Sequence, residues 1–232
     1  MSGGVDSSVA AALLCERGYK VTGVMLRLWS DDAENTENRC CSLKSMTIAK
    51  QVAGQLGIPF YVINAQEIFY KNIVEYFLAG YRAGITPNPC IMCNKLIRWG
   101  FMIETAKAMG ADLLATGHYA RIVKGADGVF QLMRAIDNNK DQSYVLSNLN
   151  QQQLSMTILP LGGYLKSEVR EMARSYNLPV SERKDSQDLC FLGGTDYRSF
   201  IRKKVAEAGK KGDIVDSIGN KVGVHNGLED YT

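Results

Sequence analysis

Long apolar runs are absent from this sequence of 232 residues. No stretch approaches the roughly 20 residues that a helix needs to cross a bilayer. The start of the chain also lacks the basic region and apolar stretch of a secretory signal, and there are no internal repeats or low-complexity tracts. We therefore expect a cytoplasmic protein with no membrane partner. Its hydrophobic content of 46% is enough to bury a core.

A disulfide framework is also not favoured, because such frameworks are rare in cytosolic chains of this size. Thiol chemistry or metal binding is the better explanation for any functional cysteine. Cys15 falls on the apolar face of a predicted helix and is interpreted as a small buried apolar residue. No role is assigned to Cys40 or Cys41. The six cysteines are at positions 15, 40, 41, 90, 93 and 190.

Charge of one sign is not abundant, since the net charge is only +3. The basic residues are concentrated, however, in residues 183–211, which hold eight Lys and Arg and four Asp and Glu. Such an excess is compatible with a polyanion partner. A solvated basic helix face explains it equally simply, and by itself the excess does not require a ligand.

Helical and strand patterns alternate along most of the chain. This alternation predicts an α/β fold with a doubly wound parallel sheet. Two prolines exclude residues 86–89 from any helix. The predicted helices are 7–17, 42–56 (with Ser42 as N-cap), 67–81, 93–109, 166–176 and 197–206. The predicted strands are 20–28, 60–63 and 112–116, with a hairpin of 120–123 and 129–135.

The pattern changes after Gly209. Residues 213–224 are typical of two short strands joined at 217–220. We therefore divide the chain into a first domain, residues 1–194, and a second part, residues 195–232. The second part is predicted to be a linker helix followed by the start of a small β-rich domain.

A glycine-rich string, SGGVDSS, occupies residues 2–8 and opens the first predicted helix. Glycines let a backbone approach a ligand closely, and a helix N-terminus attracts phosphate. Asp6 could hold Mg²⁺ against that phosphate, and as a solvent-facing loop residue it is expected to add little packing. The Gly-Lys-Ser/Thr ending of a Walker A loop is missing. A Gly-Ser turn that merely caps a helix is the alternative, but the seven-residue string is more specific than that.

The string resembles the pyrophosphate-binding loop of the ATP pyrophosphatase superfamily. Four further strings are similar, in order and spacing, to those of the tRNA-specific 2-thiouridylase family. They are TPNPCIMCNK at 86–95, ATGHYAR at 115–121, NKDQSY at 139–144 and KDSQDLCF at 184–191. The resemblance covers the whole chain. It implies an adenine nucleotide alpha hydrolase-like fold, with 1–194 as the ATP-pyrophosphatase catalytic domain and 195–232 as the beginning of a tRNA-binding domain.

The implied reaction is ATP-dependent 2-thiolation of the wobble uridine of tRNA. The 2-oxygen of uracil is a poor leaving group, and adenylation makes it a good one. A cysteine persulfide can then deliver sulfur, and a second thiol can release it. The implied partners are tRNA and a sulfur-donor protein, either a cysteine desulfurase or a sulfur relay protein. The implied cofactor is ATP with Mg²⁺.

The resemblance assigns residues to three roles. Cys93 and Cys190 are catalytic, and Cys190 carries the persulfide. Cys93 starts a predicted helix, where the helix dipole favours a thiolate. The ATP-binding set is Met1, Ser2, Gly3, Gly4, Val5, Asp6, Ser7, Ser8, Leu26 and Gly117. The tRNA-binding set is Asn88, Pro89, Cys90, His118, Lys140, Asp141 and Gln142.

The sequence departs from the family at Cys90, where the family often has aspartate. Cys90, Cys93 and Cys190 could therefore converge on a [4Fe–4S] cluster with one open iron. Zinc is a weaker competitor, because no fourth ligand is evident. Cys90 could also be a spectator. We rank persulfide chemistry ahead of the cluster.

The two ends of the sequence also differ from those of the family. Members of the family begin with an apolar strand before the loop and continue past residue 232, so we expect a chain truncated at both ends. Two other functions stay open. One is an ATP pyrophosphatase acting on a small molecule, which would need no thiol pair. The other is a non-catalytic RNA-binding iron–sulfur module, which would need no intact phosphate loop.

Overall fold

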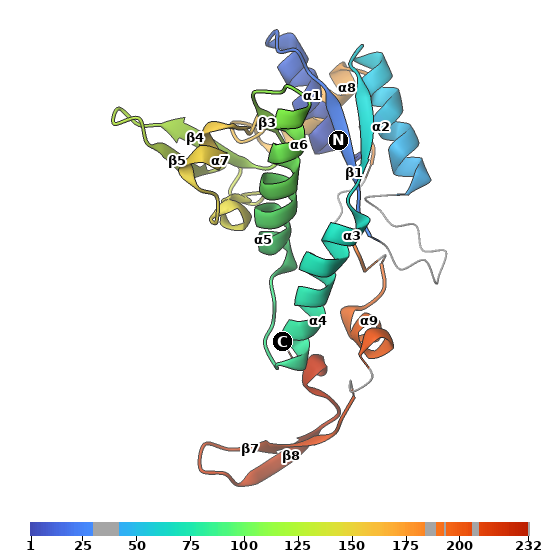
Figure 1. The fold of residues 1–232 in the computed structure, drawn as a ribbon, viewed down its shortest axis with the longest axis vertical. Coiled ribbons are helices and arrows are strands. Elements are labelled where there is room, and N and C mark those ends of the chain that lie inside the picture. The colour runs from blue at the N-terminus through green and yellow to red at the C-terminus, as the bar shows by residue number, and fades with distance from the viewer. Residues whose placement is uncertain (30–41, 184–188, 193, 206–208, 232) are drawn as a thin grey trace.

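The computed structural model describes residues 1–29, 42–183, 189–192, 194–205 and 209–231 (Figure 1). Its first element is α1 (Val5–Glu16), which begins two residues earlier than predicted, with Gly4 as N-cap. Alanine, valine and leucine make up most of this helix and are buried on nearly all sides. Against it packs α8 (Lys166–Ser175), the predicted helix 166–176. The first residues of the chain thus lead directly into α1, which is packed against α8.

Two pairs of strands are parallel, which confirms the α/β class. β1 (Gly23–Arg27) pairs with β2 (Phe60–Asn64), and β3 (Leu114–Ala115) pairs with β6 (Thr157–Ile158). In the part of the chain that the structure describes, each pair is a sheet of its own. The Met1 nitrogen donates to the Val24 carbonyl, which lies on the edge of β1 away from β2.

The helices between these strands follow the predicted ranges closely. α2 (Leu43–Gln55) is capped by Ser42, whose hydroxyl accepts the Ser45 amide at 3.1 Å, as predicted. The predicted helix 67–81 is a longer run made of α3 (Gln66–Phe69), the π-helix η1 (Tyr70–Val74) and α4 (Glu75–Arg82).

The helix predicted at 93–109 begins earlier. It runs through α5 (Pro89–Cys93), the π-helix η2 (Asn94–Phe101) and α6 (Met102–Ala108). Asn88 is the N-cap, and Pro89 takes the first helical position, where a missing amide costs nothing. The prediction that residues 86–89 are not helical is therefore wrong for Pro89.

The predicted hairpin is present as β4 (Ala120–Lys124) and β5 (Phe130–Arg134), which pair antiparallel with Lys124 opposite Phe130. Two short helices next to it were not predicted. They are the 3₁₀ helix η3 (Ser143–Leu146) and α7 (Gln151–Ser155), which precedes β6.

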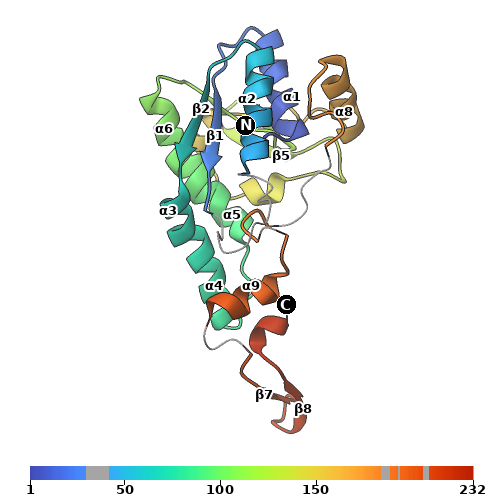
Figure 2. The same cartoon turned by 90° about the vertical axis from the view of Figure 1, so that its right-hand side faces the viewer.

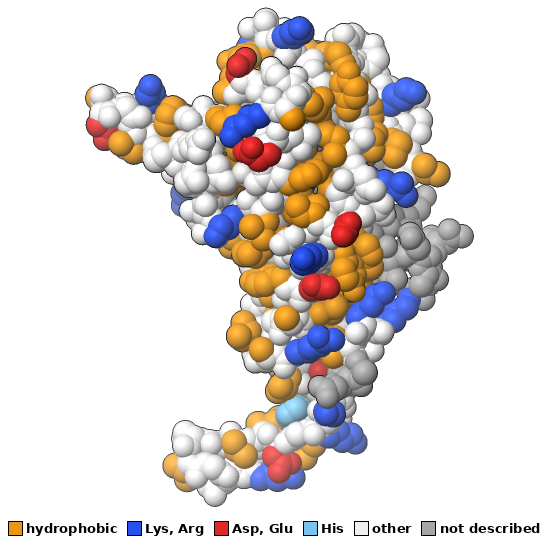
Figure 3. All heavy atoms as spheres, viewed as in Figure 1, with side chains coloured by type: hydrophobic (Ala, Val, Ile, Leu, Met, Phe, Trp, Pro, Cys, Tyr) orange, Lys and Arg blue, Asp and Glu red, His pale blue; other side chains and the backbone are white. Residues whose placement is uncertain are grey.

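The last part of the chain consists of α9 (Tyr197–Lys204), β7 (Gly212–Val215), β8 (Lys221–His225) and the 3₁₀ helix η4 (Leu228–Asp230). The two strands pair antiparallel, as predicted. Their hairpin projects away from the rest of the molecule (Figures 1 and 2), and hydrophobic side chains reach its surface (Figure 3). Ile218 and Val222, for example, are exposed. The division at residue 194 stays a prediction.

Buried side chains form several clusters. One, the phenylalanine cluster, joins the helical run 66–82 to α9 and contains Phe69, Phe77, Phe191 and Phe200. A second joins α1, α2 and α8, and a third surrounds Trp99. Among the described helices, none is both long and apolar enough to traverse a bilayer.

Candidate nucleotide and thiol site

The glycine-rich string forms a tight loop at the start of α1. Gly3 has a φ of +71°, and a Cβ there would lie 2.5 Å from the Ser45 carbonyl oxygen, so only glycine fits. The first amides of a helix have no intrahelical partner, and Gly4 has no side chain to cap those of α1. The loop therefore presents backbone donors and the positive end of a helix, an arrangement suited to phosphate.

The loop hydroxyls divide into two kinds. Ser7 Oγ accepts the Ser2 amide at 3.1 Å, and the two hydroxyls lie 3.2 Å apart. Ser8 is fully buried, and its hydroxyl donates to the Gly4 carbonyl at 2.9 Å. Val5 is buried as well. We therefore expect Ser2 and Ser7 to meet a ligand, and Ser8 and Val5 to shape the loop.

Asp6 is not the simple solvent-facing residue that we expected. Its Oδ1 accepts a hydrogen bond from the Tyr119 hydroxyl at 2.8 Å, and the Lys166 ammonium lies 2.6 Å from the same oxygen. The Asp6 side chain is 35% exposed and that of Lys166 only 11%. Lys166 could not be selected from the sequence, because it lies far along the chain and outside the strings that resemble the family.

Gly117, which follows β3, lies directly against the loop. A Cβ on Gly117 would be 2.8 Å from the Asp6 carbonyl carbon and 3.0 Å from the Ser7 nitrogen. Any larger residue would displace the first turn of α1. The structure thus brings together Gly117 and the loop, two parts of the predicted ATP-binding set.

Arg183 is a second residue at the loop that sequence reasoning missed. Its guanidinium donates to the Gly3 carbonyl at 2.7 Å and to Ser45 Oγ at 2.8 Å. Arg170 of α8 in turn donates to the Ser181 and Arg183 carbonyls. The signals for Arg183 in the sequence are its position just before the KDSQDLCF string and its place at the start of the basic segment 183–211. Arg183 places a positive charge beside the loop, whereas the charge of Lys166 is paired with Asp6.

The two predicted catalytic thiols pack against the same part of the core. Cys93 and Cys190 are both half-buried at the phenylalanine cluster, and so is Leu26, the predicted neighbour of adenine. Phe191 is buried and its ring centroid lies 5.2 Å from that of Phe77, which anchors the residue next to Cys190. Residues 184–188 of the same string lie outside the described residues.

The expectation that Cys93 starts a helix is wrong. Because the helix begins at Pro89, Cys93 is the last residue of α5 and lies beyond the first turn. The influence of the helix dipole falls off within that turn. Cys90 is the thiol in the first turn, and it is exposed.

The three thiols are not found together as a metal-binding group among the described residues. Within the described part of the chain, which includes all three, no group of three His, Cys, Asp or Glu residues is arranged to hold a metal ion. An iron–sulfur site at Cys90, Cys93 and Cys190 stays a prediction.

Residues of the predicted tRNA-binding set have intramolecular roles. The Asn88 side chain accepts the Ile91 amide at 3.2 Å, and Pro89 is buried. His118 Nδ1 lies 2.9 Å from Thr116 Oγ1, and its ring is 5.5 Å from that of Trp99. Burial, and then the charge of Arg98, lower the pKa of His118 to about 3, so this histidine is neutral.

The turn at 140–142 supports the strand that follows Gly117. Gln142 Oε1 accepts the Tyr119 amide at 3.0 Å, and Asp141 Oδ1 accepts the Ala135 amide at 2.8 Å. Burial raises the pKa of Asp141, but hydrogen bonds from Ala135 and Ser143 outweigh burial and hold the pKa of Asp141 below its usual value. The Lys140 amide donates to the Asp137 carbonyl at 3.1 Å. Contact of these residues with tRNA stays a prediction.

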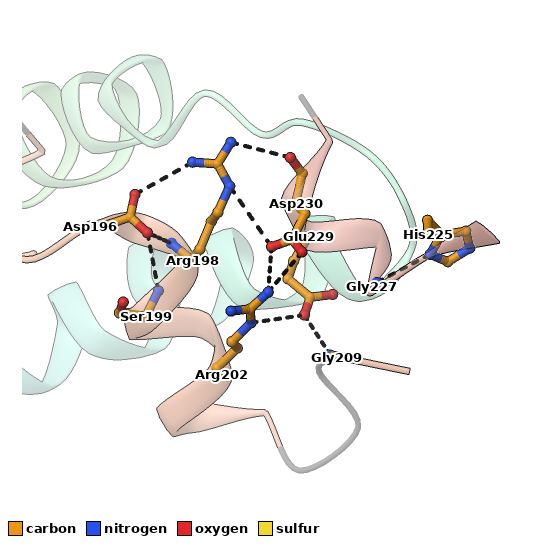
Figure 4. A network of polar contacts seen from close by, with 9 residues as sticks. All are labelled: Asp196, Arg198, Ser199, Arg202, Gly209, His225, Gly227, Glu229 and Asp230. Atoms are coloured by element: carbon orange, nitrogen blue, oxygen red, sulfur yellow. Dashed lines mark hydrogen bonds and ion pairs between the residues drawn. The ribbon is translucent and has the colours of Figure 1, made fainter. Parts of the chain in front are cut away.

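Part of the basic segment 183–211 is also neutralised within the molecule. Arg202 Nη2 donates to both carboxylate oxygens of Asp230 at 2.7 Å, and Arg202 Nε lies 3.7 Å from Glu229 Oε1 (Figure 4). Arg198 lies 3.6 Å from Asp196 and donates to the Asp230 carbonyl at 3.2 Å. These arginines therefore hold η4 against α9.

Comparison with known proteins gives a family match and close relatives. The family described as the tRNA methyl transferase HUP domain matches residues 1–194. The tRNA-specific 2-thiouridylase MnmA of Chloroflexus aurantiacus is 49% identical over 100% of this chain and 65% of that protein. That of Moorella thermoacetica is 48% identical over 100% of this chain and 66% of that protein. The chain thus spans about 65% of the length of these relatives.

Similar solved structures are more distant. The U34-tRNA thiolase NcsA from Methanococcus maripaludis, solved with its [4Fe-4S] cluster, is 20% identical with a TM-score of 0.48. That match covers 89% of this chain and 63% of the other.

Proposed function

This chain belongs to the family of the tRNA methyl transferase HUP domain, and on that premise we propose that it activates a tRNA uridine with ATP and replaces the 2-oxygen with sulfur. The relatives named tRNA-specific 2-thiouridylase share about half of its residues. Its partners are then tRNA and a sulfur-donor protein. A tRNA substrate would place the protein in the cytoplasm.

One observation carries this proposal. Cys93, Cys190 and Leu26 pack against one cluster, while the loop and Gly117 form a phosphate-type site. An ATP-dependent sulfur transfer needs both a phosphate site and two thiols from distant parts of the chain. Amide-forming members of the same superfamily have no use for the thiols.

ATP fits the residues at the loop. Amides of the first turn of α1, together with Ser2 and Ser7, would bind the β and γ phosphates, and Lys166 and Arg183 would balance their charge. Asp6 offers the kind of oxygen that Mg²⁺ prefers. The C2 oxygen of uridine would attack the α-phosphorus and release pyrophosphate, which leaves the base joined to AMP.

Sulfur transfer would follow through the two cysteines. The terminal sulfur of a Cys190 persulfide attacks C2, and AMP departs with the former 2-oxygen. The Cys93 thiolate then attacks Cys190 Sγ, which forms a disulfide and leaves sulfur on C2. An external thiol reduces that disulfide for the next turnover. We propose this route over an iron–sulfur cluster, because the three thiols are not grouped as ligands in the described residues.

The test combines pyrophosphate exchange into ATP with mass spectrometry of tRNA. We expect exchange that depends on undermodified tRNA, and loss of 2-thiouridine in Cys93→Ser and Cys190→Ser but not in Cys15→Ser. Exchange that needs no tRNA would point to a small-molecule substrate. No exchange at all would point to a non-catalytic module. Normal thiolation by Cys190→Ser would refute the persulfide role.

Gly117 gives an independent test of the nucleotide site. Gly117→Ala should weaken ATP binding by at least roughly tenfold, because its Cβ would push on the first turn of α1 and displace charge-assisted contacts to phosphate. Gly54→Ala is the matched control, since a Cβ at Gly54 of α2 meets nothing within 4 Å. Equal ATP affinity of the two variants, measured by calorimetry, would contradict the assignment.

A further inference from the structure

Lys166 contacts the loop through Asp6, although it lies far from the loop in the sequence. Its ammonium is 2.6 Å from Asp6 Oδ1 and 5.7 Å from the centre of the Tyr119 ring. Since only 11% of its side chain is exposed, this is not a mobile surface lysine. The contact joins residues that are 160 positions apart in the sequence.

The backbone around Lys166 is fixed as well. Its amide donates to Asp137 Oδ2 at 2.9 Å, and it is the first residue of α8. Val169 and Ala173 of that helix are fully buried in the cluster that includes α1. The ammonium is therefore held at the entrance of the phosphate loop, while the four-carbon side chain leaves it a short range of movement.

Asp6 cannot satisfy two cations equally well. The carboxylate that now pairs with Lys166 is the same group that would hold Mg²⁺ beside a nucleotide. A divalent ion on Asp6 would put two positive centres next to each other, and their repulsion would displace the ammonium. The phosphate loop beside it offers an anion to which the displaced ammonium can move.

Resting on the proposed nucleotide site, we propose that Lys166 is a placeholder cation. It occupies Asp6 while the loop is empty, and it transfers to the pyrophosphate part of the nucleotide when Mg²⁺ takes its place. Lys166 is then both a competitor of the metal and a positioning residue for the leaving pyrophosphate. A lysine that only stabilises the fold would have neither effect on ligand binding.

The experiment measures two probes separately by calorimetry and by the electron paramagnetic resonance of Mn²⁺. The probes are Mn²⁺ alone and inorganic pyrophosphate without metal. Lys166→Met should bind Mn²⁺ about tenfold more tightly and pyrophosphate about tenfold more weakly, roughly the effect of one charge-assisted hydrogen bond. Lys107→Met is the matched control, because Lys107 forms a comparable ion pair at 2.9 Å with Glu104 on α6. It should change neither affinity.

A reciprocal variant keeps the test decisive if Lys166→Met folds poorly. Asp6→Asn should abolish Mn²⁺ binding and tighten metal-free pyrophosphate binding, because Lys166 is released. Changes of both probes in the same direction in either variant, or unchanged pyrophosphate affinity in a folded Lys166→Met protein, would overturn the inference. These readouts need no tRNA, so they can hold even if thiolation is not the reaction, and they can fail even if it is.

Discussion

His118 illustrates how single residues near the loop are tuned by their surroundings. Its ring is tilted by 49° against that of Trp99, its Nδ1 lies 2.9 Å from Thr116 Oγ1, and burial lowers its pKa so that it stays neutral. A neutral imidazole next to a site for polyanions is an acceptor or donor of hydrogen bonds rather than a counter-ion. Any contact with tRNA phosphate would therefore be expected from nearby arginine or lysine instead.

The neutral state of His118 predicts an acid-dependent loss of stability. Its pKa falls from 6.5 to about 3 on folding. As the pH drops below 6.5 the unfolded chain takes up a proton that the folded chain refuses, so the free energy of unfolding decreases. Between pH 7 and pH 5 this loss is about 1–2 kcal/mol. His118→Gln should show a flatter dependence of melting temperature on pH in that window. Parallel curves for the two proteins would contradict the prediction.

Sequence reasoning at this scale found the loop but not its partners. Gly3, Asp6 and Gly117 lie within recognisable strings, so their convergence could be predicted. Lys166 and Arg183 meet the loop across 160 and 180 positions, and neither lies within one of those strings. A pattern of neighbouring residues cannot reveal contacts between residues so far apart in the sequence. Asp6 was therefore mistaken for a residue with few contacts.

The helical run that begins at Pro89 carries Cys93, one of the two cysteines of the proposed sulfur transfer. Its start is fixed by the Asn88 cap, and its interior by buried Ile97 and Trp99. Trp99 also donates to Thr157 Oγ1 at 2.7 Å, which ties the run to β6. Cys93 is thus carried by a helix that is anchored at its start and along one face.

Removal of the cap should be measurable. Asn88→Ala should lower the free energy of unfolding by about 1 kcal/mol, the usual value of an N-cap side chain. For a chain of this size that corresponds to a melting temperature lower by roughly 2–4 °C.

Asn88→Ser is the control, because serine caps a helix as well as asparagine does. It should melt like the wild type. If Asn88→Ser lost thiolation while keeping its stability, the asparagine amide would have a second role at the target base. Equal stability of Asn88→Ala and the wild type would show that the cap is not needed.

Elements with strong periodicity were predicted well, and short ones were not. The glycines at 125 and 128 marked the hairpin of β4 and β5 correctly. Pro89 was taken as a helix breaker, although proline is equally favourable at a first helical position. β6 has only two residues, so it carries no alternation that could reveal it. Its pairing with β3 depends on the tertiary fold alone.

At the scale of the whole molecule, η4 fastens the β7–β8 hairpin to the rest. Glu229 is almost fully buried and accepts the Gly209 amide, while Arg202 binds both Asp230 oxygens (Figure 4). η4 also contacts α4. This clasp explains why arginines of α9 are not available as a simple basic face.

Glu229→Ala should loosen the clasp without unfolding the first domain. A buried donor left without its acceptor costs about 1–3 kcal/mol. Amides of η4 and α9 should therefore exchange hydrogen faster, while those of α1 should not change. Asp213→Ala is the control, since its pair with Lys221 is more than half exposed on both sides. Slow exchange in η4 of the Glu229 variant would show that the hairpin is held by other contacts.

The distant partners of the phosphate loop have a consequence for how the protein is made. Gly3 and Asp6 leave the ribosome early, but Tyr119, Lys166 and Arg183 are added much later. The glycine-rich start cannot reach its final structure until α8 and the segment after it have been synthesised and can pack against it. A translation product that stops short of Arg183 would contain the entire loop sequence and yet lack the guanidinium that binds Gly3 and Ser45. The nucleotide site can therefore be completed only after the chain has been synthesised as far as Arg183.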